Sequence, residues 1–392
     1  MYTEKVRIYP NKQQRKQILD WRIKCCNLYN FILDCQDDLY DLVKLNINSY
    51  NNQIFINFVN TEGVFKQVLN DACSRSYKSR KRWLSSFKKG SKLKGMKHPK
   101  YKSLHNYRSF TYPQFNVKNG CRGSKFIDNK HIKLGKLGII RCKLDRQING
   151  KCKTCTIKEH KSGKYYAYIT VDNADIQYPI PANRSTKVGI DLGIEKFAVM
   201  SDGTYISKPK FITTNDKKLC RLHRKLSKKQ LGSNNKNKVR LKLAKTYEKL
   251  NNQRNDFHYK VIHFLTHKYE SIAVENLHLT DLYTKDISKK LKNLLKLASL
   301  NSFLDKLRTQ SVKYNCQIIN VDPKNTTQLC SSCGSIVPKT LRDRVHSCPN
   351  CGFVCNRDLN AALNIEQLGF STRGTVGHTG SVKLVETKIP GV

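Results

Sequence analysis

The stretch Val188-Gly-Ile-Asp-Leu-Gly193 decides the fold, because it places an acid inside a run that is otherwise apolar. We predict a strand that ends at the second glycine, and a further strand from Phe197 to Met200. A lone buried carboxylate costs several kcal/mol unless a cation or hydrogen-bond donors compensate it. Asp191 is therefore a candidate functional residue, although a nearby lysine could also satisfy it, either Lys187 or Lys196.

A second acid lies at the end of another strand predicted to be buried. Ser271 to Val274 is largely apolar, and Glu275 follows it directly. Two carboxylates at the ends of neighbouring strands suggest a shared Mg²⁺ ion, which takes oxygen ligands. A third acid, Asp358, opens the last predicted helix, which runs to Leu368. The helix dipole alone would favour an acid there, so each residue taken singly also has a structural explanation.

Two cysteine knuckles lie between the second and third acids. They are Cys330-Ser-Ser-Cys333-Gly and Cys348-Pro-Asn-Cys351-Gly, separated by residues 334–347. Four thiolates bind zinc tetrahedrally, so this spacing predicts a structural Zn²⁺ ion, although the gap is slightly shorter than usual. A disulfide or free dithiol is the alternative, disfavoured in a reducing compartment. The loop between the knuckles carries basic residues that either contact nucleic acid or face solvent: Arg342, Arg344 and His346.

Charge dominates the composition of the 392 residues. There are 73 Lys and Arg against 29 Asp and Glu, a formal net charge of +44. Such an excess repels itself in a compact chain, which predicts a polyanionic partner: nucleic acid first, and an anionic membrane surface as the alternative. No apolar run approaches the roughly 18 residues of a membrane span. The first ten residues lack the apolar stretch of a signal peptide, and the 15 cysteines do not form a secreted disulfide framework. We therefore expect a soluble intracellular protein.

The composition and the predicted secondary structure change twice along the first half of the chain. A strand before Pro10 is followed by a helix with Asn11 as N-cap, which we expect to run to about Asp34. Arg75 to Lys102 contains 12 basic residues and no acid, with four interleaved aromatic residues, a pattern that favours phosphate contact over a merely solvated face. Short strands with hairpin turns fill Ser109 to Asp175, and their aromatic residues are expected mainly to pack in the core.

The second half is predicted to be α/β after the Pro-containing linker at about residue 180. Lys217 to Arg254 is a basic helical pair broken at Gly232-Ser233-Asn234, with 14 Lys and Arg against one acid. A helix from Lys290 to Tyr314 and a strand from Gln317 to Val321 precede the knuckles. The CxxC pair formed by Cys152 and Cys155 has no matching second pair nearby, so no zinc site is expected there.

The order of these motifs resembles a known pattern. It runs Ile190-Asp191-Leu-Gly193, Ala273-Val274-Glu275-Asn276-Leu277, the CxxC pairs, and Arg357-Asp358-Leu-Asn360-Ala361-Ala362-Leu-Asn364-Ile365. It is similar to the split RuvC nuclease of the transposon-encoded TnpB proteins and of the related type V CRISPR effectors. The likeness is tight from about Lys187 to Leu368 and looser upstream. One departure is Asn356, where the family often has an acid two residues before the last catalytic Asp; the change is expected to alter metal affinity at most.

The pattern of predicted helices and strands, together with the resemblance, predicts a multidomain α+β protein. The expected domains are an all-β, barrel-like wedge domain (1–10 and 100–180), a helical recognition domain inserted into it (11–99), an RNase H-like (RuvC) α/β domain (185–325 and 353–368), the inserted zinc ribbon (326–352) and an irregular tail (369–392).

The resemblance also implies a mechanism. Asp191, Glu275 and Asp358 would hold two Mg²⁺ ions, about 4 Å apart, around one phosphodiester. A guide RNA from the transposon end would pair with one strand of a double-stranded DNA target, while the protein holds the heteroduplex by its backbone. The expected location is the cytoplasm, at the nucleoid, for a prokaryotic protein, and the nucleus for a eukaryotic or viral relative.

Two other hypotheses stay open at this point. An unguided RuvC-like resolvase or transposase would share the strand acids, but it needs neither the ribbon nor so basic a front half. A nucleic-acid-binding regulator that does not cut would not need all three acids, and only Asn356 favours it.

Overall fold

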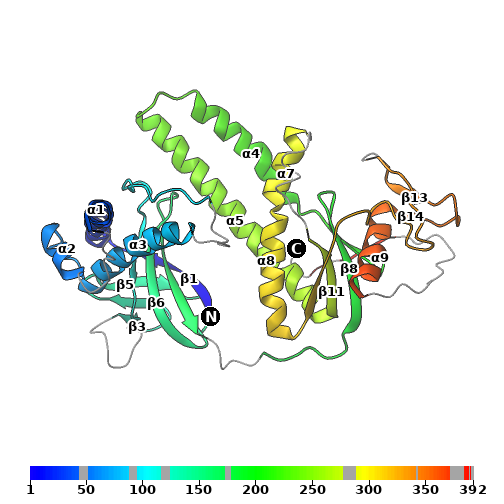
Figure 1. The fold of residues 1–392 in the computed structure, drawn as a ribbon, viewed down its shortest axis with the longest axis horizontal. Coiled ribbons are helices and arrows are strands. Elements are labelled where there is room, and N and C mark those ends of the chain that lie inside the picture. The colour runs from blue at the N-terminus through cyan, green and yellow to red at the C-terminus, as the bar shows by residue number, and fades with distance from the viewer. Residues whose placement is uncertain are drawn as a thin grey trace. The chain divides into compact units, whose positions relative to one another are not determined.

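The computed structural model describes residues 1–43, 52–87, 95–115, 124–172, 178–276, 288–340, 343–370, 384–387 and 389. The chain divides into two compact units, Met1–Ile176 and Gln177–Val392 (Figure 1). Among the described residues, no helix combines the length and the apolar character needed to cross a membrane.

The first unit is built on a seven-stranded antiparallel sheet in the order β2-β6-β7-β1-β5-β4-β3. The chain's first strand therefore lies in the middle of the sheet, between strands from the second half of the unit. Its elements are β1 (Tyr2–Tyr9), α1 (Lys12–Val43), α2 (Asn52–Phe58), α3 (Lys66–Ser85), β2 (Ser109–Tyr112), β3 (Lys125–Phe126), β4 (His131–Leu134), β5 (Gly138–Lys143), β6 (Lys151–Glu159) and β7 (Tyr165–Asp172).

Helix α1 begins as the sequence predicts. The Oδ1 atom of Asn11 accepts a hydrogen bond from the backbone N–H of Gln14 at 2.8 Å, and the Gln14 side chain accepts one from the Asn11 N–H at 3.0 Å. These reciprocal bonds form a capping box. The predicted end near Asp34 is wrong, because the helix continues to Val43. No Gly or Pro occurs between these two positions to stop it.

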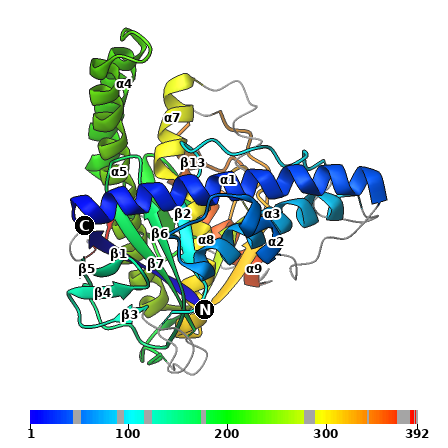
Figure 2. The ribbon, with the colours of Figure 1, turned by 90° about the vertical axis from the view of Figure 1, so that its left-hand side faces the viewer.

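The two faces of the first unit's sheet differ in character. Helices α1 and α3 lie against one face of the sheet (Figure 2). Their buried side chains join that face in one core, in which the ring centroids of Trp21 and Phe110 are 5.6 Å apart. Cys152 and Cys155 are both buried in that core. Alternate residues of β1 face outward, and they are basic or aromatic: Lys5, Arg7 and Tyr9.

The second unit contains a six-stranded mixed sheet in the order β12-β11-β8-β9-β10-β15, in which β8, β11 and β12 are parallel. Its elements are β8 (Ser185–Leu192), β9 (Lys196–Met200), β10 (Thr204–Ser207), α4 (Lys210–Ser227), α5 (Asn234–Lys268), β11 (Tyr269–Glu275), α7 (Lys289–Ala298), α8 (Leu300–Ser311), η2 (Val312–Tyr314), β12 (Gln317–Val321), β13 (Val345–Ser347), β14 (Val354–Asn356), α9 (Arg357–Phe370) and β15 (Val385–Glu386).

Helices cover both faces of this sheet (Figure 1). Side chains of α5 and α8 form the larger core with one face, and α9 packs against the other. The basic helical pair is confirmed as α4 and α5, with Ser233 capping α5. The single helix predicted from Lys290 to Tyr314 is wrong, because Ser299 adopts a left-handed backbone (φ 55°) that separates α7 from α8.

The chain after Leu368 also differs from the irregular tail expected over 369–392. Helix α9 ends at Phe370, and Val385–Glu386 pairs in parallel with Thr204 and Tyr205 as strand β15. An edge strand such as β10 offers unpaired backbone groups, which this short segment satisfies. Two residues are too few to give a strand pattern in the sequence.

Candidate active site and metal centre

Asp191 and Glu275 lie at the same end of two neighbouring strands and on the same face of the sheet. Strands β8 and β11 are parallel, and their register pairs Ile190 with Val274, one residue before each acid. Glu275 is therefore the last residue of β11, and Asp191 beside it is the last but one of β8. Side chains two apart share a face, and Gly189, two before Asp191, meets α9 so closely that a Cβ there would lie 2.1 Å from a carbonyl oxygen of that helix. The two carboxylates thus project on the side of the sheet that α9 covers.

Helix α9 contributes the third acid. Asp358 lies in its first turn, half-buried, and its backbone N–H donates to the Oδ1 atom of Asn356 at 3.0 Å. Asn356 therefore serves as the N-cap of the helix. The departure from the family pattern at this position places a strong capping residue two positions before the acid. This local role supplies a structural reason for an Asn at position 356.

Glu275 and Asp358 lie close enough to Asp191 to affect its protonation. Burial, followed by the negative charges of Glu275 and Asp358, raises the pKa of Asp191 well above its ordinary value, and only the Arg357 guanidinium opposes this. Burial likewise raises the pKa of Glu275, against a hydrogen bond from Thr326 that lowers it. Carboxylates that repel one another in a partly buried site are the arrangement that a bound cation relieves.

Arg357 also makes contacts at this site that were not predicted from the sequence. Its Nε and Nη2 atoms each lie 3.2 Å from Oδ1 of Asp358, and Nη1 donates to the backbone carbonyl of Asp343 at 2.9 Å. One side chain thus joins the last acid to the loop between the knuckles. A basic residue beside an acid is common, so the pattern alone gave no signal.

The four cysteines come together in one cluster. Among the described residues, they form the group whose metal-ligand atoms all lie within 4.8 Å of one another. Sγ of Cys330 is 3.7 Å from Sγ of Cys351, and Sγ of Cys333 is 3.6 Å from Sγ of Cys348. Zn–S bonds of about 2.3 Å at tetrahedral angles place sulfurs about 3.8 Å apart, far beyond the roughly 2 Å of a disulfide. The donor set therefore fits Zn²⁺.

A ribbon that depends on zinc should lose the ion when one sulfur is removed. Cys348→Ser is expected to reduce bound zinc from about one ion per chain to well below half and to lower the melting temperature, because structural zinc supplies much of the folding free energy of such small modules. The measurement is metal analysis after dialysis, combined with thermal unfolding. Cys355→Ser, a buried thiol in β14 outside the cluster, is the matched control and should keep its zinc. Full zinc retention by Cys348→Ser would show that the cluster is not the zinc site.

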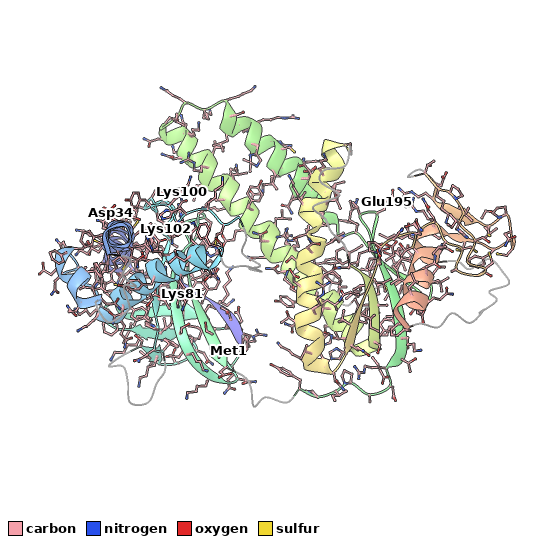
Figure 3. All side chains as sticks on the ribbon, in the orientation of Figure 1. Met1, Asp34, Lys81, Lys100, Lys102 and Glu195 are labelled. Carbon is pink, nitrogen blue, oxygen red and sulfur yellow. The ribbon has the colours of Figure 1, made fainter. Side chains whose placement is uncertain are left out.

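The basic residues predicted between the two knuckles lie in different environments. Arg344 forms an exposed ion pair of 3.1 Å with Glu195, which follows β8. His346 is fully buried beside Lys339, so its side chain neither contacts nucleic acid directly nor faces solvent, and both alternatives are wrong for this residue. Arg342 lies outside the described residues. The labelled Glu195 can be located in Figure 3.

The aromatic residues of the basic stretch from Arg75 to Lys102 mostly make contacts within the protein. Trp83 meets Phe87 and His98 edge-on, with centroids 5.1 and 4.4 Å apart. The Tyr101 hydroxyl donates to Asp34 of α1, near the labelled Lys100 and Lys102 (Figure 3). Phosphate contact by the basic side chains of this stretch stays a prediction.

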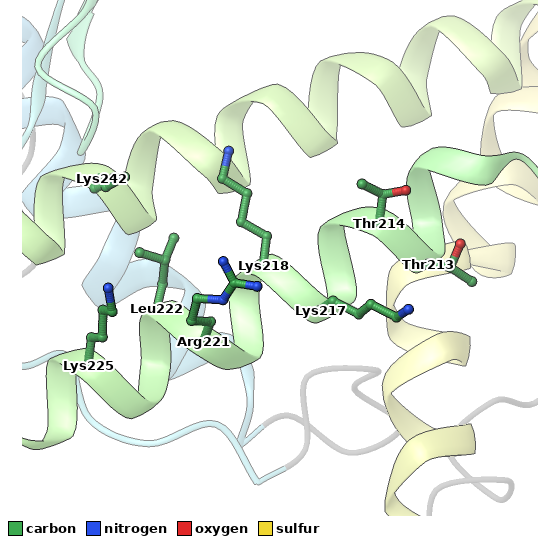
Figure 4. A pocket seen from close by; sticks show the side chains of 8 residues that line it. All are labelled: Thr213, Thr214, Lys217, Lys218, Arg221, Leu222, Lys225 and Lys242. Carbon is green, nitrogen blue, oxygen red and sulfur yellow. The ribbon is translucent and has the colours of Figure 1, made fainter.

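A basic groove of about 540 Å³ lies along α4 (Figure 4). Helical spacing puts its residues on one face of α4, joined by one residue of α5, and no acid lines it. The lining residues are Thr213, Thr214, Lys217, Lys218, Arg221, Leu222, Lys225 and Lys242. Five cations and two hydroxyls in one groove are a favourable environment for phosphate groups.

The chain matches two family models. One, OrfB_IS605, described as a probable transposase, covers residues 168–286, and the other, described as the Cas12f1-like TNB domain, covers residues 301–365. The first match spans β8 to β11 with both strand acids, and the second spans α8 to α9 with the cysteine cluster.

Individual proteins are also similar. A putative RNA-guided DNA endonuclease, InsQ, of Escherichia coli is 29% identical over 284 residues, covering 69% of this chain and 68% of the relative. A TnpB-like protein of Acanthamoeba polyphaga mimivirus is 25% identical, covering 94% of this chain and 73% of its own. A solved Cas12f1–sgRNA–target DNA complex contains a chain that matches with a TM-score of 0.54 at 14% identity, over 93% of this chain and 98% of that one, which shows a shared fold.

The fold and the site define a class of protein in which a mixed α/β sheet carries an acid cluster, and a four-cysteine ribbon precedes the helix that bears the last acid. Both matched models fall on that part of the chain, and named relatives extend the likeness over most of its length. The resemblance inferred from the motifs is confirmed: the matching family models and relatives are of the TnpB and Cas12f kind.

Proposed function

We propose that this chain is an RNA-guided DNA endonuclease, encoded by a transposon, which cleaves DNA at Asp191, Glu275 and Asp358. The observation that carries the proposal is the convergence of three acids, from two parallel strands and a helix far along the chain, with Glu275 and Asp358 close enough to Asp191 to raise its pKa. The relatives from Escherichia coli and Streptomyces pristinaespiralis are both named putative RNA-guided DNA endonucleases.

The fold of each unit and the domain boundaries are part of the same proposal. We assign the second unit to the RNase H-like (RuvC) fold, supported by its central β11-β8-β9 strands, with acids at the ends of β8 and β11. The domain boundaries expected from the sequence are proposed with it. The first unit, with its antiparallel sheet and helices α1, α2 and α3, would be the wedge and recognition part.

The acids suit a divalent cation. Mg²⁺ takes carboxylate oxygens and keeps several waters, so a site with few protein carboxylates, such as this one, is typical of it. Bound there, it would supply an activated water and charge stabilisation for phosphodiester hydrolysis. Asp191 and Glu275, fixed at adjacent strand ends, would hold it, and α9 would orient Asp358. Arg357 fixes Oδ1 of Asp358 and leaves the other carboxylate oxygen of that residue available.

Two surfaces support a nucleic-acid partner. The groove on α4 is one. The outer face of the first unit's sheet is the other, where Lys5 lies 4.2 Å and Arg7 5.0 Å from the ring centroid of Tyr166. Tyr9, 45% exposed, lies next to Arg7 and opposite Arg141. Cations interleaved with tyrosines can hold phosphates and stack on bases together.

The α4 groove gives a prediction that salt titration can test. Lys218→Gln with Arg221→Gln should weaken RNA or DNA binding and reduce the slope of log K against log salt concentration by about 1.5, since each lost phosphate contact contributes about 0.7–0.9. Lys12→Gln with Lys16→Gln, exposed on α1, removes the same charge elsewhere and serves as the control. An unchanged slope in the groove variant, matching the control, would show that the groove does not contact phosphates.

The guide is tested by expressing the gene with its native 3′ flank and sequencing RNA that co-purifies with the protein. We expect one abundant RNA from that flank, whose 3′ end names a DNA target for a Mg²⁺-dependent cleavage assay. Absence of a discrete RNA would favour an unguided resolvase or transposase. Guided binding without cutting would favour a regulator.

A further inference from the structure

Thr326 lies between the sheet and the ribbon and is 1% exposed. It follows β12, four residues before the first cysteine of the cluster. Its Oγ1 hydroxyl donates to Oε1 of Glu275, at the end of the neighbouring strand β11. The same hydroxyl also lies 3.3 Å from the backbone carbonyl of Pro323, a longer contact. The carboxylate of the second acid therefore has a fixed donor on one of its two oxygens.

The loop that carries Thr326 is held by the helix that carries Asp358. Asn364 of α9 donates to the Thr326 carbonyl at 2.8 Å and to the Leu329 carbonyl at 2.7 Å. One turn earlier, Asn360 donates to the same Leu329 carbonyl at 2.6 Å and accepts from the Ser331 N–H at 3.0 Å. Both Asn side chains are buried. Buried amides with two partners each hold the loop in one place, because breaking them would leave polar groups unsatisfied.

These bonds form a continuous connection from α9, through the loop before the first knuckle, to Glu275. A carboxylate at a strand end is free to turn about its side-chain bonds unless a neighbour holds it. Donation to Oε1 fixes that rotation and leaves Oε2 available. Groups that orient a metal ligand in this way change metal affinity or activity by about 10- to 100-fold when they are removed.

We propose that Thr326 is a positioning residue for the acid site: its hydroxyl holds the Glu275 carboxylate in the orientation that binds a divalent cation. The inference rests on the proposed function, in that it takes the three acids as the cation site. It assigns Thr326 a function beyond its place in the ribbon, and it makes the loop before the first knuckle one wall of that site.

The test compares two substitutions of Thr326. Thr326→Val has nearly the same shape but no hydroxyl, whereas Thr326→Ser keeps the hydroxyl and loses a methyl group. Mn²⁺ binding to the purified protein is measured by calorimetry, and the Mg²⁺ concentration for half-maximal DNA cleavage is measured in parallel. We expect Thr326→Val to weaken Mn²⁺ binding about 10- to 100-fold and to raise the Mg²⁺ requirement. Thr326→Ser should stay within a few-fold of the unchanged protein.

Zinc content and melting temperature separate positioning from a general structural role. Thr326→Val should keep one zinc ion per chain and lose little stability, and Thr327→Val, at the half-buried neighbouring residue, should behave as the unchanged protein. Equal Mn²⁺ affinity in Thr326→Val and the unchanged protein would overturn the inference. So would equal impairment of Thr326→Ser and Thr326→Val, since the hydroxyl would then not be the cause.

The outcome also distinguishes this inference from the proposed function. If Asp191→Asn abolishes Mn²⁺ binding but the unchanged protein cuts no DNA, the proposed activity fails, and the Mn²⁺ affinities of the two Thr326 variants still decide the inference. If Mn²⁺ binding does not respond to Asp191→Asn, the acids are not the cation site, and the inference is overturned with it.

Discussion

Asp191→Asn is expected to lower DNA cleavage by roughly 1,000-fold or more, equivalent to about 4 kcal/mol in activation free energy at 1.36 kcal/mol per factor of ten. The substitution keeps the shape of the side chain and removes the charge that would hold the cation. Asp191 is the most affected of the three acids, since burial and two neighbouring carboxylates all act on it. The measurement is the single-turnover cleavage rate of a guide-matched DNA at saturating RNA.

Binding should behave differently from cutting in this variant. The basic surfaces that would hold RNA and DNA do not involve Asp191, so the dissociation constant for a matched target should change by less than about threefold. In the metal-free protein the melting temperature should rise, because the substitution removes a buried charge that two other carboxylates repel. A fall in stability would mean that the carboxylate is satisfied by a partner within the protein.

The control is a neighbouring acid that is not part of the cluster. Glu195 follows β8, is 69% exposed at its side chain and pairs with Arg344 at the surface. Exposed ion pairs contribute little, so Glu195→Gln should leave cleavage and stability nearly unchanged. Cleavage that persists in Asp191→Asn, at the rate of this control, would place the active site elsewhere in the chain.

The acids and the cysteines could be found in the sequence because each violates a local expectation. An acid in an apolar strand such as the one around Asp191 is costly, and two CxxC knuckles at suitable spacing have few alternatives. Their order along the chain then pointed to the family. The likeness could not establish their geometry, which follows from the parallel pairing of β8 with β11 and from the placement of α9.

The residues that support the site could not be found in this way. Thr326 and the two Asn residues of α9 act through backbone carbonyls and a carboxylate distant in the chain, and a polar residue in a loop or helix carries no mark of such a partner. The left-handed backbone at Ser299 could not be predicted from the sequence either, since Ser is common in helices of mixed polarity. Pairings between distant segments therefore had to come from the structure.

Gly189 gives the second prediction with a large effect. A Cβ at this position would lie 2.1 Å from the carbonyl oxygen of Ala362 and 2.5 Å from the amide nitrogen of Glu366. Both obstacles are backbone atoms of α9, so no side chain can move aside. Gly189→Ala is therefore expected to lower the free energy of unfolding by about 3 kcal/mol, at the upper end of the usual range for overpacking. Thermal and urea unfolding would measure this loss.

The same substitution should also reduce cleavage beyond its effect on stability. Pushing α9 away from β8 separates Asp358 from Asp191, because these two elements carry the two acids. Gly232→Ala, in the turn between α4 and α5, is the matched control: its Cβ would meet no atom within 4 Å, and only its positive φ of 80° makes Ala unfavourable, by about 1 kcal/mol. That variant should cut at the normal rate when folded. If Gly189→Ala were as stable and as active as Gly232→Ala, α9 could not lie against β8, and the three acids would not share one site.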